Sequence, residues 1–257
     1  MSEAIVWALW GHFGLRVKKM IGWRVSLMGE DQELDLLKQS ISDDPDWSMT
    51  KDQGGYYLTP KTLFHEGEVE AIHTRAATWT NRINLVGPLL LPRFQRISFT
   101  LEYIKNDGAK LHFAFQAFAG ASGFAAAAGA ALGPDGRPVR AQIPPIVSMA
   151  RAMARQNVAE AVQLFHARRD DFTQLCNVIE MVRNDLQIDI PRTWVSHTKL
   201  NLMERTAQFR ETAGDTARHA KAKGKPPKPI PLLDAQQIVR QILIRWVQYR
   251  SSSEGRR

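Results

Sequence analysis

The chain has little cysteine, which excludes two kinds of site at once. Only Cys176 among the 257 residues carries a thiol, so the sequence supports neither an intramolecular disulfide nor a metal site built from several cysteines. Cys176 follows a helical pattern with Leu175, Val178 and Ile179, which predicts a buried and unreactive side chain. A chain with so little use for disulfides fits a reducing compartment, and we expect a cytoplasmic protein.

The chain also lacks a long apolar run. The run from Ala4 to Trp10 is too short to span a bilayer, and the nearby positive charges follow it, whereas a secretory signal has them first. We therefore predict that residues 1–29 form an N-terminal extension, either packed or disordered. A membrane-surface helix is the alternative, because two tryptophans and trailing lysines suit such a surface. No integral membrane segment is expected.

Complete catalytic and cofactor motifs are missing as well. There is no Gly-x-Ser-x-Gly elbow, and the uncharged, Ala/Gly-rich residues 111–134 contain neither Gly-Lys-Ser/Thr nor a full dinucleotide fingerprint. Glu70 and His73 form one Glu-x-x-His pair, but the comparable site from Gln163 to His166 has no carboxylate. We therefore expect no metal and no cofactor, and favour a protein that is not an enzyme.

What the chain does have is periodic hydrophobicity, first in an α+β pattern over residues 30–143. Residues 33–41 and 66–86 have the spacing of amphipathic helices, the second ending near Gly87-Pro88, and residues 54–58 suit a short strand. Residues 97–103 and 111–117 alternate on either side of an Asn-Asp-Gly turn, which predicts a tight hairpin. One face of this hairpin is aromatic, and the helix that carries Trp79 is expected to cover it.

A helical domain is predicted over residues 144–250. Five segments have helical spacing: residues 146–155, 158–167, 172–186, 195–209 and 232–249. Residues 251–257 are expected to be a disordered tail. The fold class is therefore α+β, with a small antiparallel sheet and a covering helix followed by a helical C-terminal domain.

The net charge of +8 permits attraction to nucleic acid or another polyanion, although many soluble proteins have such a charge without that partner. The excess positive charge is concentrated between Arg192 and Pro229, a segment that contains nine Lys or Arg and only three Asp or Glu. The candidate binding residues within it are Arg218, His219, Lys221, Lys223, Lys225 and Lys228. A purely structural interpretation also accounts for these residues. Arg218 and His219 would be cations near the last carbonyls of a helix, and the lysines would belong to a solvated linker that prolines stiffen.

Arg218 and His219 are also the residues that a metal-independent ribonuclease would use, with histidine as general acid/base and a cation against the phosphate. Together with Arg183-Asn184 they resemble the HEPN family of helical bundles, many of which are ribonucleases. That family has an arginine, a polar residue, four to six further residues and a histidine. Here the next histidine after Asn184 is His197, thirteen residues on, so the spacing differs and the activity is not carried over.

Two segments resemble parts of uncharacterised bacterial proteins. These are the strand and helix over residues 55–83, and the C-terminal run with Ala-Arg-His and Pro-Pro-Lys-Pro over residues 209–246. The resemblance implies a bacterial cytoplasmic protein and no particular reaction. Three hypotheses follow: a non-enzymatic binding or accessory protein that contacts phosphate or nucleic acid, a HEPN-like ribonuclease, and a structural module that recognises a protein partner through the aromatic hairpin face and the Trp246 helix.

Overall fold

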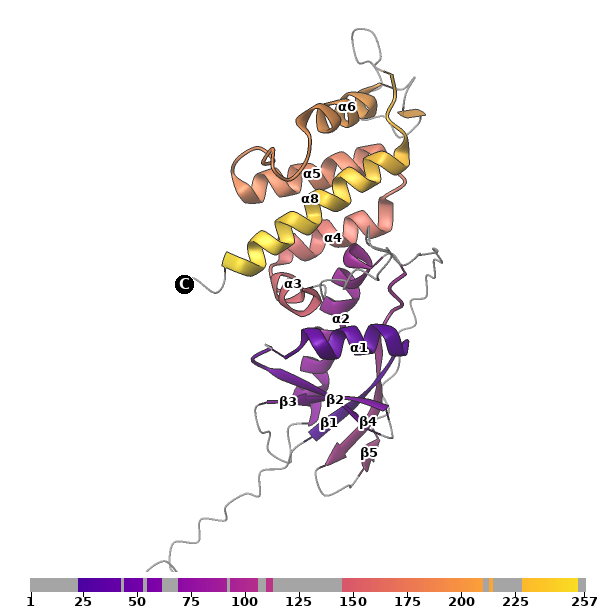
Figure 1. Ribbon diagram of the computed structural model, residues 1–257, viewed down its shortest axis with the longest axis vertical. Helices are drawn as coiled ribbons and strands as arrows, with labels where there is room; N and C mark the ends of the chain where they lie inside the picture. Colours follow the sequence, from indigo (N-terminus) through magenta and orange to yellow (C-terminus); the bar gives the residue numbers. More distant parts are fainter. Residues whose placement is uncertain are drawn as a thin grey trace, which may run out of the picture.

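The computed structural model describes residues 23–42, 44–52, 55–61, 69–91, 93–105, 110–112, 145–209, 213–214 and 228–253. Within these ranges the fold is α+β, as predicted, with a small antiparallel sheet at one end and a group of helices at the other (Figure 1). Most of the N-terminal extension and residues 254–257 of the tail lie outside the described residues. The start of the tail does not, because the last helix runs to Ser253.

The sheet has five strands in the order β2-β3-β1-β4-β5, and every neighbouring pair is antiparallel. The strands are β1 (Trp23–Met28), β2 (Trp47–Asp52), β3 (Gly55–Pro60), β4 (Ser98–Lys105) and β5 (Lys110–His112). β4 and β5 form the expected hairpin, in which Ile104 pairs with Lys110. β1 corrects the sequence interpretation, because it lies in the middle of the sheet although its residues were placed in the N-terminal extension. Its alternation puts Val25 and Leu27 in the core.

Two helices pack on the sheet and supply the rest of this core: α1 (Asp31–Ser40) and α2 (Val69–Leu90). Val25, Leu58 and Met49 are register partners on three adjacent strands, so they point to the same face. These residues share one hydrophobic cluster with a buried stripe of α2, and α2 contacts β4; the stripe consists of Ile72, Ala76, Trp79, Ile83 and Val86. The predicted covering helix is confirmed.

α2 does not end at Gly87-Pro88 but runs through both residues to Leu90. Pro88 removes one helical donor, which normally ends a helix. Here neighbouring helices bind the last carbonyls: His166 Nε2 donates to the Leu85 carbonyl, and Arg240 Nε donates to the Leu89 carbonyl, each at 2.9 Å. Tertiary contacts thus override the local stop signal.

All five helices expected in the C-terminal part are present: α3 (Ile146–Ala152), α4 (Gln156–Arg168), α5 (Phe172–Leu186), α6 (His197–Gln208) and α8 (Leu232–Ser253). Asp171 caps α5 by accepting a hydrogen bond from the Thr173 amide at 2.8 Å. Cys176 is buried, as expected. Within the described ranges, no helix combines the length and apolarity that crossing a bilayer needs.

A polar network ties three of these helices together. The Asp185 carboxylate on α5 accepts hydrogen bonds from Asn157 of α4 at 2.7 Å, and from Trp246 and Arg250 of α8 at 2.6 Å each. Trp246 is fully buried. Its side chain therefore belongs to the core, whereas a role of this helix in recognising a partner stays a prediction.

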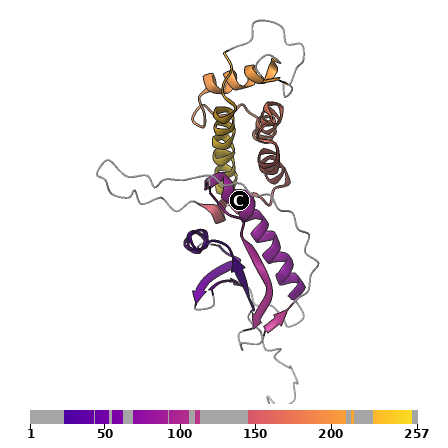
Figure 2. The ribbon, with the colours of Figure 1, turned by 90° about the vertical axis from the view of Figure 1, so that its right-hand side faces the viewer.

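The sheet part and the helical part are joined through α2. Seen from the side, α2 rises from the sheet toward the helical group (Figure 2), and it packs against α3, α4 and α8. The buried apolar residues of both parts belong to one hydrophobic cluster. The division into domains at residues 143 and 144 stays a prediction.

Candidate functional site

Most of the basic segment singled out in the sequence lies outside the described residues. This holds for Arg218, His219, Lys221, Lys223 and Lys225, whereas Lys228 is described and exposed shortly before α8. The Arg183 part of the HEPN-like pattern is described. Arg183 donates to Asp189 at 2.8 Å and to Glu204 at 2.5 Å, so it joins the end of α5 to α6.

The two histidines that bear on the earlier hypotheses also have structural partners. His197 Nε2 donates to the Ile190 carbonyl at 2.8 Å. His73 packs edge-on against the Phe99 ring, with centroids 5.3 Å apart, and burial lowers its pKa. Across the described part of the chain, no three His, Cys, Asp or Glu side chains are grouped so that they could hold a metal ion.

A pocket lies where the sheet part meets the helical part, and it has a volume of about 270 Å³. Three segments far apart in sequence line it: the loop between α1 and β2 with the first residue of β2, the middle of α2, and α3. Its described lining residues are Asp44, Asp46, Trp47, Thr74, Arg75, Thr78, Trp79, Arg82, Val147, Ala150 and Arg151.

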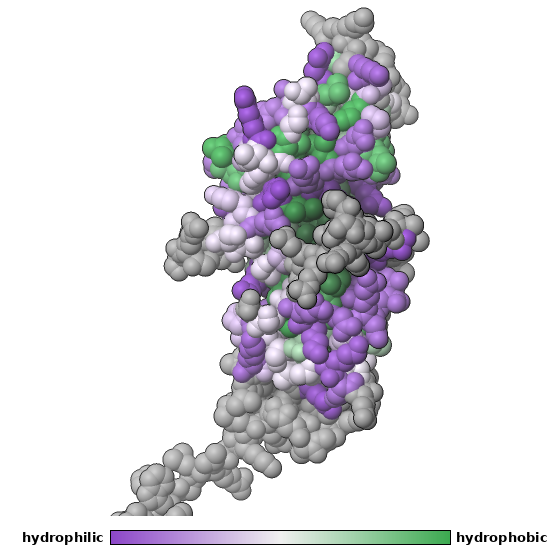
Figure 3. All heavy atoms as spheres, in the orientation of Figure 1, coloured by the Kyte–Doolittle hydropathy of each residue, from purple (hydrophilic) through white to green (hydrophobic). Residues whose placement is uncertain are grey.

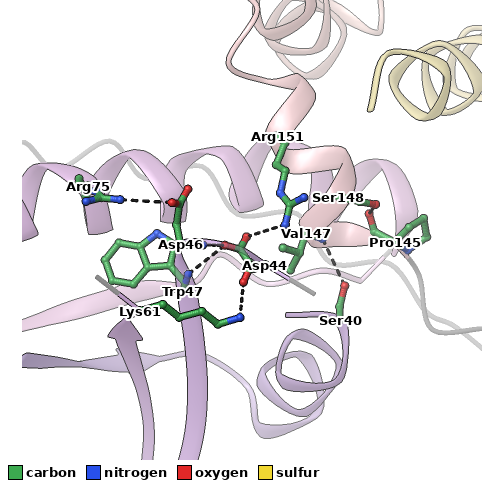
Figure 4. Close-up of polar contacts among 10 residues, drawn as sticks. All are labelled: Ser40, Asp44, Asp46, Trp47, Lys61, Arg75, Pro145, Val147, Ser148 and Arg151. Atoms are coloured by element: carbon green, nitrogen blue, oxygen red, sulfur yellow. Dashed lines mark hydrogen bonds and ion pairs between the residues drawn. The ribbon is translucent and has the colours of Figure 1, made fainter. Parts of the chain in front are cut away.

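Asp44 organises one wall of this pocket, as Figure 4 shows. It is only 4% exposed, and its Oδ1 accepts hydrogen bonds from the backbone amides of Asp46 at 2.8 Å and Trp47 at 3.0 Å. Its Oδ2 lies 3.6 Å from Arg151 of α3, and its carbonyl accepts a hydrogen bond from Lys61 Nζ. One buried aspartate therefore connects the α1–β2 loop, the end of β3 and α3.

Three arginines converge on the pocket from two helices. Arg75 pairs with Asp46 and Arg151 pairs with Asp44, each at 3.6 Å, which is long for an ion pair. Arg82 has no hydrogen bond or ion pair to any described residue. With three guanidinium groups against two carboxylates, the described lining carries one excess positive charge.

The Trp79 indole adds a donor without an acceptor. Trp79 is 7% exposed, and its Nε1 is buried with no hydrogen-bond partner among the described residues. Arg75, Trp79 and Arg82 are four and three residues apart on α2, so they follow one side of the helix. Nearly all buried polar groups in proteins are hydrogen-bonded. An unpaired N–H that lines the same pocket as an arginine with no counter-ion among the described residues therefore indicates a place for an acceptor.

None of these pocket residues belongs to a motif that the sequence reveals. The Asp-rich residues 43–46 match no binding motif, and the sequence of α2 is most noticeable for its apolar positions. A usable signal was present on α2, where Thr74, Thr78 and Arg82 repeat at intervals of four residues beside the apolar stripe.

Comparison with known proteins gives no family for the chain. No family model matches it, and no curated protein and no solved structure is similar to it.

Proposed function

We propose that this protein is a non-enzymatic binding protein that takes a small anionic group of a partner, a phosphate or a carboxylate, into the pocket between α2, α3 and the α1–β2 loop. Arg82 carries the proposal, because its guanidinium has no counter-ion among the described residues and the unpaired Trp79 N–H lies on the same side of α2. A guanidinium presents several donors in one plane, which suits the paired oxygens of either group.

The size of the pocket limits what enters it. Pockets for drug-sized ligands span about 300–1,000 Å³, and this one is just below that range at about 270 Å³. Trp47 and Trp79 are 3% and 7% exposed, so they form walls and do not offer open rings for stacking. The pocket therefore suits a compact charged group better than a nucleobase.

The composition of the lining favours binding over catalysis. Among the described lining residues there is no histidine, cysteine, lysine or tyrosine to act as nucleophile or base. The two carboxylates lie against arginines, and Asp44 Oδ1 also accepts two backbone hydrogen bonds. Such a lining suits the binding of an anion.

The character of the surface supports a polar partner. On the face shown in Figure 3, hydrophilic side chains predominate among the described residues, and the hydrophobic ones gather mainly over the helical part. The basic segment from Arg218 to Lys228 favours the same class of partner, because its cations attract phosphates without reading sequence. A phosphorylated or nucleic-acid partner is therefore part of the proposal.

Calorimetric titration of the full chain with inorganic phosphate and with acetate, at low salt, tests the pocket. Arg82→Gln should weaken binding by about 10- to 100-fold, which corresponds to about 1.5–3 kcal/mol for a hydrogen bond to a charged group. Arg245→Gln is the matched control, because Arg245 is exposed on α8 and does not line the pocket.

Trp79→Phe makes the test more specific, because it removes the N–H and keeps most of the ring. We expect about fivefold weaker binding, the equivalent of about 1 kcal/mol. If Arg82→Gln and Arg245→Gln bind both anions as tightly as the wild type, the pocket is not the anion site.

A further inference from the structure

Two aromatic rings meet on the surface of the helical part, where the last turns of α8 approach the connection between α5 and α6 (Figure 1). The rings of Trp194 and Tyr249 have centroids 6.2 Å apart and planes tilted by 56°, an ordinary geometry for an aromatic pair. Trp194 is half-buried and packs against the core, whereas Tyr249 is 52% exposed. The contact therefore holds the Tyr249 ring in place while much of it still faces solvent.

Two arginines flank this aromatic pair. Arg245 lies one turn before Tyr249 on α8, so both side chains leave the same side of the helix. Arg192 lies two residues before Trp194, in a turn that the Trp194 amide closes by donating to the Pro191 carbonyl at 2.9 Å. Both arginines are exposed, and neither makes a hydrogen bond or an ion pair to a residue that the structure describes.

The acidic groups in the last turn of α5, in the connection after it and in α6 are already in use. Asp185 accepts a hydrogen bond from Arg250 at 2.6 Å, and Asp189 and Glu204 both accept hydrogen bonds from Arg183. These elements therefore leave the charges of the two flanking arginines without a described counter-ion, and an anionic partner would supply one.

A polyanion that also carries flat groups fits this arrangement better than an acidic protein segment does. In a nucleic acid strand each phosphate has a base beside it, and here an exposed ring lies about 6 Å along the helix axis from an unpaired guanidinium. Bases stack on aromatic side chains, and arginines attract the phosphates next to them. An acidic peptide would satisfy the arginines but give the ring nothing to stack on. Single strands are favoured over duplexes, because their bases can leave the stack.

We infer that Arg192, Trp194, Arg245 and Tyr249, the Trp194–Tyr249 surface, bind single-stranded nucleic acid. One base stacks on Tyr249, Trp194 supports that ring, and the two arginines attract the flanking phosphates. The inference goes beyond the proposed function, because the surface shares no residue with the pocket lining. Free phosphate has no base to stack, and a single exposed arginine binds an ion only weakly, so Arg245→Gln is still a valid control for the pocket.

Fluorescence anisotropy of a labelled single-stranded oligothymidylate of about ten nucleotides, titrated with the full chain, tests this surface. Tyr249→Ala should weaken binding at least fivefold, as expected for the loss of one stacked base. Tyr249→Phe is the matched variant, since it keeps the ring and loses only the hydroxyl, and it should bind as the wild type does. Neither substitution should change the affinity for a duplex of the same length.

The double variant Arg192→Gln/Arg245→Gln tests the charges. It should reduce the slope of log K against log salt by about 1.4, or about 0.7 for each phosphate contact that is lost. Arg168→Gln is the control for charge. Arg168 is exposed at the end of α4, next to Arg169, whose carbonyl binds Gln236 thirteen residues before Tyr249 on α8.

Three results would overturn the inference. The single strand could fail to bind, or Tyr249→Ala could bind it as tightly as the wild type, which would leave the aromatic pair a purely structural contact. Tyr249→Ala could also weaken the binding of polyglutamate as much as that of the oligonucleotide, and the surface would then recognise acidic protein. The pocket is tested separately by free phosphate and Arg82→Gln, so either proposal can fail while the other holds.

Discussion

Replacing Asp44 by alanine should destabilise the protein far more than the same change at Asp46, although the two side chains lie two residues apart beside the same pocket. Asp44 is 4% exposed and accepts two backbone hydrogen bonds, whereas the Asp46 side chain is 61% exposed and pairs with Arg75 at 3.6 Å. The difference depends on burial and on the backbone donors, since both residues face an arginine.

The expected size follows from the groups that would be left unpaired. Each buried donor that loses its partner costs about 1–3 kcal/mol, and Asp44→Ala deprives two amides, those of Asp46 and Trp47, of an acceptor. The pair with Arg151 adds at most about 1 kcal/mol, because Arg151 is 41% exposed. We therefore expect a loss of about 3–5 kcal/mol for Asp44→Ala and at most about 0.5 kcal/mol for Asp46→Ala.

Urea unfolding followed by circular dichroism measures both values. Asp44→Asn separates the two contributions, because the amide oxygen can still accept both backbone hydrogen bonds while the charge is lost. It should cost about 1 kcal/mol. Equal losses for the alanine variants at residues 44 and 46, or an Asp44→Asn variant as unstable as Asp44→Ala, would refute the anchoring role of Asp44.

Three further variants test the environment of single residues. Burial lowers the pKa of His166 in the folded state, so below pH 6.5 the unfolded chain takes up a proton that the native state lacks. The free energy of unfolding should therefore decrease as the pH is lowered below 6.5. His166→Gln should reduce this pH dependence, as measured by urea unfolding at several pH values. Burial raises the pKa of Glu33, whose Oε2 is buried and has no hydrogen-bond partner among the described residues. The folded state therefore favours the protonated carboxyl, and the free energy of unfolding should decrease as the pH rises above 4.5. Glu33→Gln should remove this decrease and stabilise the protein at pH 7. Gly87→Ala improves helix propensity by about 1 kcal/mol, but the new Cβ would overlap the Phe94 ring. We therefore expect a net destabilisation of about 1–3 kcal/mol. Thermal melts should show that Phe94→Leu partly relieves it.

Periodicity predicted most of the helices because each buries a stripe that local spacing reveals. α5 begins and ends at the predicted residues, 172 and 186. β1 was missed for a physical reason: a six-residue strand has only a few alternating positions, and its partners β3 and β4 lie about 30 and 75 residues further along the chain. The end of α2 was misplaced because the contacts that hold it through Pro88 come from His166 and Arg240.

The candidate pocket was harder to predict than the fold. Its charged lining comes from residues 44–46, 75–82 and 151, and none of these segments has a motif of its own. By contrast, the Arg218–Lys228 segment stands out in the sequence because its lysines are clustered. That Arg82 has no counter-ion among the described residues becomes visible only once the neighbours in space are known.

The shared core leads to a last prediction, about how the two parts unfold. The buried residues of the sheet and of the helical group form one cluster, and α2 contributes to both sides of it through its packing on β4, α3, α4 and α8. Separating the parts would expose apolar surface of α2 and break the His166 and Arg240 contacts at its end. We therefore expect a single cooperative urea transition.

His73 on α2, against the sheet, and Cys176 in the helical part provide independent probes, by histidine NMR and by thiol labelling. Coincident midpoints would show one cooperative unit, and two separated midpoints would show that the chain divides into independent domains near residue 144.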